Sequence, residues 1–212
     1  VSFTATAASV ESGPAVSSGG VVNGASFRPA TAVNGEVAPG TIVAIFGTGL
    51  AAADASATTI PLPATLGETS VTFNNIDAPL FFVSAAQINA QLPFNVPAGA
   101  ATIVVRRGNA ASAARTVNVT AASPGIFTAN RQGTGTGAIL HADTYQSVSN
   151  SNPTRPGEYL AIYCTGLGQL RTPVASGAIA PTPPPETVAT PQVTIAGIPA
   201  PVRLWFHGEH GL

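Results

Sequence analysis

The sequence contains no lysine and a single cysteine, Cys164. Without lysine, the chain has neither the phosphate-binding lysine of a Walker A loop nor a lysine that forms a Schiff base. A single cysteine excludes an intrachain disulfide framework. The eight basic residues are all arginines and are scattered along the chain. They do not form the basic face that neutralises nucleic-acid phosphates, so we expect no nucleic-acid partner.

Long apolar runs and surface charge are also scarce. The longest apolar run, at 41–53, contains two glycines and is shorter than the ~20 residues that a membrane-spanning helix needs. We therefore expect no membrane span. Charged residues make up 8% of the chain and the net charge is −1, so electrostatic repulsion between copies is weak and association is favoured.

The apolar residues that are present follow the pattern of short β-strands. From Val21 onward, runs rich in β-branched side chains alternate with Gly, Pro and Asn turns, and no stretch has a sustained helical period. The runs are "TIVAIFG", "TSVTFNN", "APLFFVS", "QINAQLPF", "ATIVVRRG" and "ARTVNVT". Their length and spacing are typical of an antiparallel β-sandwich.

Two segments of the chain occur twice. "PGTIVAIFGTGL" at 39–50 returns as "PGEYLAIYCTGL" at 156–167, and "TSVTFNNIDAPLFF" at 69–82 returns as "PQVTIAGIPAPVRLW" at 191–205. A repeat distance of about 100 to 120 residues indicates a duplicated domain, since solenoid units are much shorter. We predict two tandem sandwiches, the first over 21–121 and the second over 122–212.

Residues 1–20 precede both predicted sandwiches. Val1, Phe3, Ala5 and Ala7 alternate with serine and threonine, which is a strand pattern. The stretch then becomes rich in Ser, Gly and Pro, which is typical of a flexible connector. We predict an N-terminal extension strand, followed by a connector that ends at residue 20.

The second copy is shorter than the first. The first copy continues for 41 residues from Pro79 to Thr120, whereas 11 residues follow the matching Pro201. About 30 residues, those equivalent to 91–120, therefore have no counterpart. We expect the second sandwich to lack its final strands and to have an open edge, and we place that edge at Val202, Leu204 and Phe206.

Five stretches carry a resemblance to a known family: "GVVNGASFRP", "APGTIVAIFGTGL", "PLPATLGETSVTFNNIDAPLFFVSAAQINAQLPF", "SPGIF" and "RPGEYLAIYCTGLGQL". Together they are similar to the Solibacter-type C-terminal domain of large secreted proteins of soil acidobacteria. Each half also resembles the IPT/TIG immunoglobulin-like domains. These resemblances imply two immunoglobulin-like sandwiches in an extracellular or cell-surface protein. They bring no catalytic residue with them.

Metal binding is one chemistry that the side chains suggest. His207, Glu209 and His210 carry imidazole and carboxylate groups that suit zinc or nickel. Glycines surround them, however, and structural zinc sites need four ligands on fixed elements. We interpret these residues as a solvated tail and expect no metal.

Nucleophilic catalysis is a second possibility, with Cys164 as nucleophile and His141 and Asp143 as its partners. Because Cys164 takes the place of Gly47 at the end of a core strand in the repeat, we expect a small buried thiol instead. The three aspartates, Asp54, Asp77 and Asp143, are spread among predicted loops and suggest no carboxylate pair.

The remaining motifs are weak. "QGTGTGA" at 132–138 has the glycines of a dinucleotide loop, but no helix follows it, so we interpret it as an interdomain connector. "NVT" at Asn118 matches the glycosylation sequon and equally fits a plain strand. Tyr163, Trp205 and Phe206 suit a sugar-stacking platform, although the interior of a sandwich is their expected place.

These observations favour a structural protein over an enzyme. We predict that copies of the chain assemble head-to-tail, because residues 1–10 of one copy donate a strand to the open edge of the next. We expect no catalytic residue and no cofactor. The alternative is a binding module for polysaccharide or for another surface protein, within a larger secreted protein.

Overall fold

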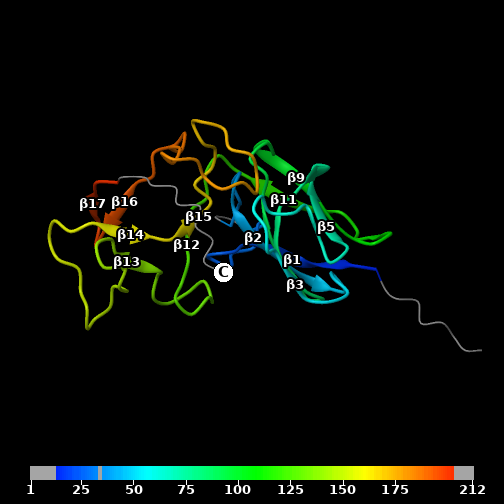
Figure 1. The fold of residues 1–212 in the computed structure, drawn as a ribbon, viewed down its shortest axis with the longest axis horizontal. Coiled ribbons are helices and arrows are strands. Elements are labelled where there is room, and N and C mark those ends of the chain that lie inside the picture. Colours follow the sequence, from blue (N-terminus) through cyan, green and yellow to red (C-terminus); the bar gives the residue numbers. More distant parts are fainter. Residues whose placement is uncertain (1–12, 33–34, 203–212) are drawn as a thin grey trace, which may run out of the picture.

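The computed structural model describes residues 13–32 and 35–202. Every regular element in these residues is a β-strand, and they contain no helix that is long and apolar enough to cross a membrane (Figure 1). The prediction of an all-β, antiparallel, sandwich-like fold is confirmed. The predicted extension strand, Val1, Phe3, Ala5 and Ala7, lies outside the described residues, and so do Leu204 and Phe206 of the predicted acceptor edge.

The first half of the chain, residues 13–121, contains two antiparallel sheets. The first sheet has the strand order β1-β2-β8-β7-β3, with bounds β1 Ala15–Asn23, β2 Ile42–Thr48, β8 Gln87–Gln91, β7 Leu80–Val83 and β3 Ala55–Ser56. The second has the order β10-β9-β5-β4, while β11 pairs with β9 and β6 with β5. Its bounds are β10 Ala110–Ala111, β9 Gly99–Arg107, β5 Thr69–Phe73, β4 Thr65–Leu66, β11 Arg115–Val119 and β6 Ile76–Asp77.

Side chains from both sheets form one buried cluster in the first half. Alternate residues along each strand point inward, because the side-chain period of a strand is two. Val43 and Ile45 come from β2, whereas Val71 and Phe73 come from β5, and all four are completely buried. The "TIVAIF" and "TSVTF" runs are therefore core strands of one sandwich.

The connector prediction is wrong for residues 15–20, which form the first part of β1. Val16 is 3% exposed and its carbonyl accepts a hydrogen bond from Arg115 Nε at 3.1 Å. The pairing of β1 with β2 shifts register between Val16 and Val21. Residues 17–20, the Ser/Gly run, form a bulge in β1, because the extra residues of a bulge are not paired with the neighbouring strand.

The second half, residues 122–202 as described, is less regular. It contains three separate two-stranded antiparallel sheets, β12-β15, β13-β14 and β16-β17. The bounds are β12 Gly125–Ile126, β15 Cys164–Thr165, β13 Ile139–His141, β14 Leu160–Ile162, β16 Val193–Ile195 and β17 Ile198–Ala200. Among its described residues, Leu170 is the only hydrophobic side chain that is fully buried. Two-stranded sheets are marginal on their own, so the second half depends on other contacts.

Candidate functional site

The strands β13 and β14 reproduce the pairing of β1 and β2. The matching pairs are His141–Leu160 with Asn23–Val43, Leu140–Ala161 with Val22–Ala44, and Ile139–Ile162 with Val21–Ile45. The turns that follow also match, because Phe27 and Tyr145 both have φ of 55°. In each turn the backbone N–H of this aromatic residue donates to the carbonyl of the last strand residue at 2.8 Å. The sequence repeat is thus a repeat of backbone structure.

The strands β12 and β15 extend this correspondence. Gly125 pairs with Thr165 as Ala15 pairs with Thr48. Residues 127–138 then take the place of the bulge in β1. The glycine-rich loop lies within this insertion, where Gly133 N and Gln132 N donate to Thr128 Oγ1 at 3.0 and 3.2 Å. It is an enlarged bulge inside the second half, which corrects the prediction of an interdomain connector.

The hairpin β16-β17 reproduces β5-β6. Ile195 pairs with Ile198, as Phe73 pairs with Ile76. Both hairpins turn through two residues of positive φ: Asn74 at 49° and Asn75 at 63°, then Ala196 at 50° and Gly197 at 82°. Two such residues match the right-handed twist of the flanking strands, which closes a tight hairpin in the same register twice.

The two hairpins differ in what pairs with their first strand, β5 or β16, on the edge that faces away from the second strand of the hairpin. In the first half, β9 pairs with β5, and Phe73 is completely buried. In the described part of the second half, β17 is the only strand that pairs with β16. Ile195 is 55% exposed and Ile198 is 71% exposed. The outer edge of β16 and these two side chains form the surface that we call the β16 edge.

The second half exposes more large apolar side chains than the first. In the first half, Ile60 is the only large hydrophobic residue of this kind among the described residues. In the second half the exposed ones are Ile126, Tyr145, Tyr159, Tyr163, Ile179, Val188, Ile195 and Ile198. Exposed apolar side chains that gather in one region indicate a surface that another element or molecule covers.

Side chains and backbone groups of the two halves are in direct contact. Ile42 N donates to Thr165 Oγ1 at 2.8 Å, and Asn23 Nδ2 donates to the carbonyl of Ser123 at 3.2 Å. Gly166, with φ of +83°, lies at this junction: a Cβ there would lie 2.1 Å from the carbonyl oxygen of Ser123 in its own half and 3.3 Å from Thr41 Oγ1 of the first half. Only glycine permits this approach of two backbones. The second half is therefore fixed to the first close to the start of β2.

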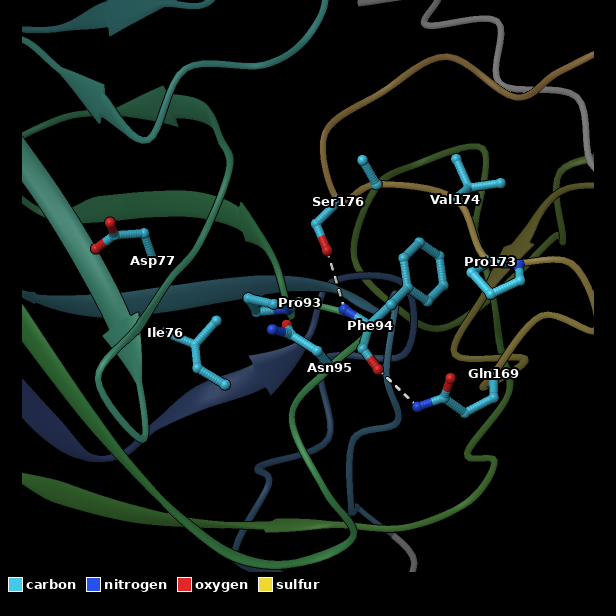
Figure 2. Close-up of a pocket in the computed structure, with 10 residues that line it drawn as sticks. Ile76, Asp77, Pro93, Phe94, Asn95, Gln169, Pro173, Val174 and Ser176 are labelled. Carbon is cyan, nitrogen blue, oxygen red and sulfur yellow. Dashed lines mark hydrogen bonds between the residues drawn. The ribbon is translucent and has the colours of Figure 1, made fainter.

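Figure 2 shows a second contact between the halves, around Phe94. Phe94 N donates to Ser176 Oγ at 3.0 Å, and Gln169 Nε2 donates to the Phe94 carbonyl at 2.6 Å. The cavity beside this contact has a volume of about 570 Å³. Asp77 is the only ionisable residue among those that line it. The lining also contains the Ser176 hydroxyl, which accepts the hydrogen bond from Phe94 N.

The structure does not bring Cys164 together with His141 and Asp143, the partners considered for it as a nucleophile. Cys164 is half-buried, and burial raises the pKa of its thiol, which disfavours the reactive thiolate. His141 is held elsewhere: Nδ1 lies 2.5 Å from Glu158 Oε1 and Nε2 lies 3.2 Å from the carbonyl oxygen of Asn152. Asp143 is exposed. His141 thus fastens the loop between β13 and β14.

The other predicted site residues are not gathered together. Tyr163 is 47% exposed, so the expectation that it lies in the core is wrong. The Asn118 side chain is exposed on β11, and Val202 is half-buried. Trp205, Phe206, His207, Glu209 and His210 lie outside the described residues. In the described ranges, no group of three or more His, Cys, Asp or Glu side chains could hold a metal ion.

Sequence reasoning placed the open edge at Val202, Leu204 and Phe206 and did not single out β16, whose only partner among the described residues is β17. The signal was present, because "VTIAGI" aligns with "VTFNNI" and the segment that follows the first copy contains the partner strand β9. Comparison of the chain with protein-family models and with curated proteins finds no match. The resemblance to the Solibacter-type domain and to IPT/TIG domains therefore stays a prediction.

Proposed function

We propose that this chain is a non-enzymatic structural module that polymerises head-to-tail outside the cell. In this proposal both halves are immunoglobulin-like sandwiches, and the second is completed by a strand from the N-terminal extension of a neighbouring copy. Strand addition of this kind gains affinity from backbone hydrogen bonds and specificity from alternate side chains. The proposal needs no cofactor, and the partner is another copy of the chain.

One observation carries this proposal: the same hairpin occurs twice, but a third strand pairs with it only once in the described residues. β5 pairs with β9 as well as with β4 and β6, whereas β17 is the only partner of β16 within residues 13–32 and 35–202. An unpaired strand edge is a template for another strand. The N-terminal segment has the alternation of a strand, with Val1 and Phe3 on one face.

The arrangement of the two halves favours an open chain of copies. In Figure 1, β1 begins at the end of the first half that points away from the second half, while β16 and β17 lie near the opposite end of the long axis. Donor and acceptor are therefore different surfaces on one molecule. Such heterologous contacts produce filaments unless the rotation between copies closes a ring.

The test compares residues 1–212 with residues 13–212. The truncation starts at 13 because β1 begins at Ala15 and a later start would remove core residues. We expect the full chain to form species that grow with protein concentration in light scattering, and the truncated chain to be a monomer with unchanged circular dichroism. A full chain that stays monomeric, or a truncated chain that assembles equally well, contradicts strand donation.

Polysaccharide binding is a second candidate, favoured by exposed aromatic rings. Tyr145 is 67% exposed and Tyr159 is 65% exposed. The two lie near each other in the chain fold, because Tyr145 N donates to the carbonyl of His141 and Ala142 N donates to that of Tyr159. Aromatic faces stack on sugar rings. A glycan-array signal that disappears in Tyr145→Ser supports this function, and an unchanged signal or none contradicts it.

A further inference from the structure

The strand β9 defines what a strand beside β16 must look like. β9 lies antiparallel to β5, with Ile103 opposite Phe73 and Val105 opposite Val71. Ile103 and Val105 are completely buried, whereas Thr102, which points to the opposite face of β9, is exposed. A strand in the position of β9 therefore needs apolar side chains at every second residue. The largest of them should lie opposite the last residue of the hairpin's first strand, as Ile103 lies opposite Phe73.

The repeat transfers these requirements to β16. Ile195 takes the place of Phe73, and Val193 takes the place of Val71, in a hairpin of identical register. The offset between these positions is 122 residues. Residues 13–32 and 35–202 as described supply no strand to this place.

We propose that residues 1–7 of a second copy occupy the place of β9 beside β16, antiparallel, with Phe3 opposite Ile195 and Ala5 opposite Val193. This inference rests on the proposed function and adds the acceptor strand and the register. It moves the acceptor edge from Val202 and the residues after it to the β16 edge.

The first seven residues meet the pattern of β9. Val1, Phe3, Ala5 and Ala7 align with Ala101, Ile103, Val105 and Arg107, and the residues between them are serine and threonine. The largest donor side chain, Phe3, falls opposite Ile195, which is 55% exposed. The first ten residues contain no charge, glycine or proline, which are the features that weaken strand pairing at an edge.

The chain's own geometry makes a second copy the donor. β1 begins at Ala15, at the end of the first half that points away from the second half, whereas β16 lies near the opposite end of the long axis (Figure 1). The segment before β1 is therefore attached at the end remote from the β16 edge of its own molecule, which favours the β16 edge of a neighbouring copy.

Disulfide cross-linking between copies measures the register. In the β5–β9 ladder, Asn74 N donates to the carbonyl of Thr102 and Gly108 N to that of Glu68. The pair Val71–Val105 lies between such hydrogen-bonded pairs, where Cα atoms approach to about 4.5 Å. The equivalent pair is Ala5 with Val193. We therefore use Ala5→Cys with Val193→Cys in a Cys164→Ser background, and Ala7→Cys with Val193→Cys as the control shifted by two residues.

We expect the first variant to form a ladder of disulfide-linked oligomers, and the control to cross-link at least about tenfold less, because its diagonal spacing of about 7–8 Å exceeds disulfide reach. Phe3→Ser, which changes only the tail, should weaken assembly about ten- to hundredfold, since it removes the burial of one large apolar side chain.

The outcomes separate this inference from the proposed function. If the full chain assembles but the control cross-links as fast as the Ala5–Val193 variant, or neither cross-links, the register is wrong while strand donation stands. Assembly that Phe3→Ser leaves unchanged also overturns the register. If the disulfides form only within monomers, the tail pairs with β16 of its own molecule, and the inference that a second copy is the donor is wrong. A full chain that never assembles overturns both proposals.

Discussion

Ile45 and Ile162 are the same residue at the same position of the repeat, and they offer a direct test of how the two halves differ. Ile45 is completely buried and lies between Val21 and Ile88 on the two neighbouring strands. Ile162 is half-buried, and its strand β14 has one neighbour, β13, among the described residues. We predict that Ile45→Ala destabilises the protein much more than Ile162→Ala.

The magnitude follows from the carbon atoms removed. Ile→Ala deletes three carbons, worth about 0.8 kcal/mol each when fully buried, and a rigid core adds a cavity cost that brings the usual range to about 2–5 kcal/mol. We expect about 3–4 kcal/mol at Ile45, where atoms pack on all sides. At half-buried Ile162 the transfer contribution is about halved and the surroundings can collapse, which gives about 1 kcal/mol.

Urea unfolding of residues 13–212 provides the assay, because a chain without the tail cannot form the proposed assembly and so reports the stability of the monomer. Far-UV circular dichroism follows both halves, and tyrosine fluorescence follows the second half, where all three tyrosines lie. With m of about 1–3 kcal/mol/M, Ile45→Ala should lower the midpoint by at least about 1 M, and Ile162→Ala by less than half as much. Equal shifts for the two variants refute the reasoning.

Two further predictions concern the junction of the halves. Thr165→Val leaves Ile42 N without its acceptor and should lower the free energy of unfolding by about 1–3 kcal/mol. The control is Thr48→Val, at the matching but exposed position, which should change that free energy by less than about 0.5 kcal/mol. Equal effects of the two variants in urea unfolding would contradict this prediction. Because burial raises the native pKa of the Cys164 thiol, its stabilising contribution is complete below the pKa of the unfolded thiol and is lost as pH rises through the native pKa. Urea midpoints between about pH 8 and 11 should therefore fall more steeply for the natural chain than for Cys164→Ser, and parallel profiles would exclude this linkage.

Sequence periodicity was sufficient to predict a strand where buried and exposed side chains alternate along it. "TSVTF" alternates, and its Val71 and Phe73 are completely buried. For "TIVAIF" the expectation that Ile42, Ala44 and Phe46 form the buried face is wrong, because Val43 and Ile45 lie in the core while Ile42 and Phe46 are half-buried. The repeat was also visible, because the same residues build the same register twice. Local pattern and tertiary packing agree at these positions, which is the condition under which sequence reasoning succeeds.

The failures occur where backbone geometry departs from the simple pattern. A Ser/Gly run indicates a connector, but a bulge keeps residues 17–20 within β1, since the buried side chains of Val16 and Val21 fix both ends. Tyr163 was expected in the core because aromatic side chains of a sandwich usually lie there, although its counterpart in the repeat, Phe46, is itself half-buried. Tyr163 is 47% exposed, because burial depends on the layer that faces a strand, and that layer is not part of the local sequence.

The edges of the first half show how the chain prevents unwanted pairing, and β16, although only three residues long, differs from them in its lack of nearby charge. β3, β4 and β10 are edge strands of two residues each, and β1 carries a bulge. Short and bulged edges are poor templates for another strand. Around β16, by contrast, no charged residue occurs from 187 to 202. A monomer with such an edge either recruits a defined strand or aggregates without order. Deleting residues 1–12 should therefore abolish concentration-dependent assembly, whereas association through a generally sticky surface would survive the deletion.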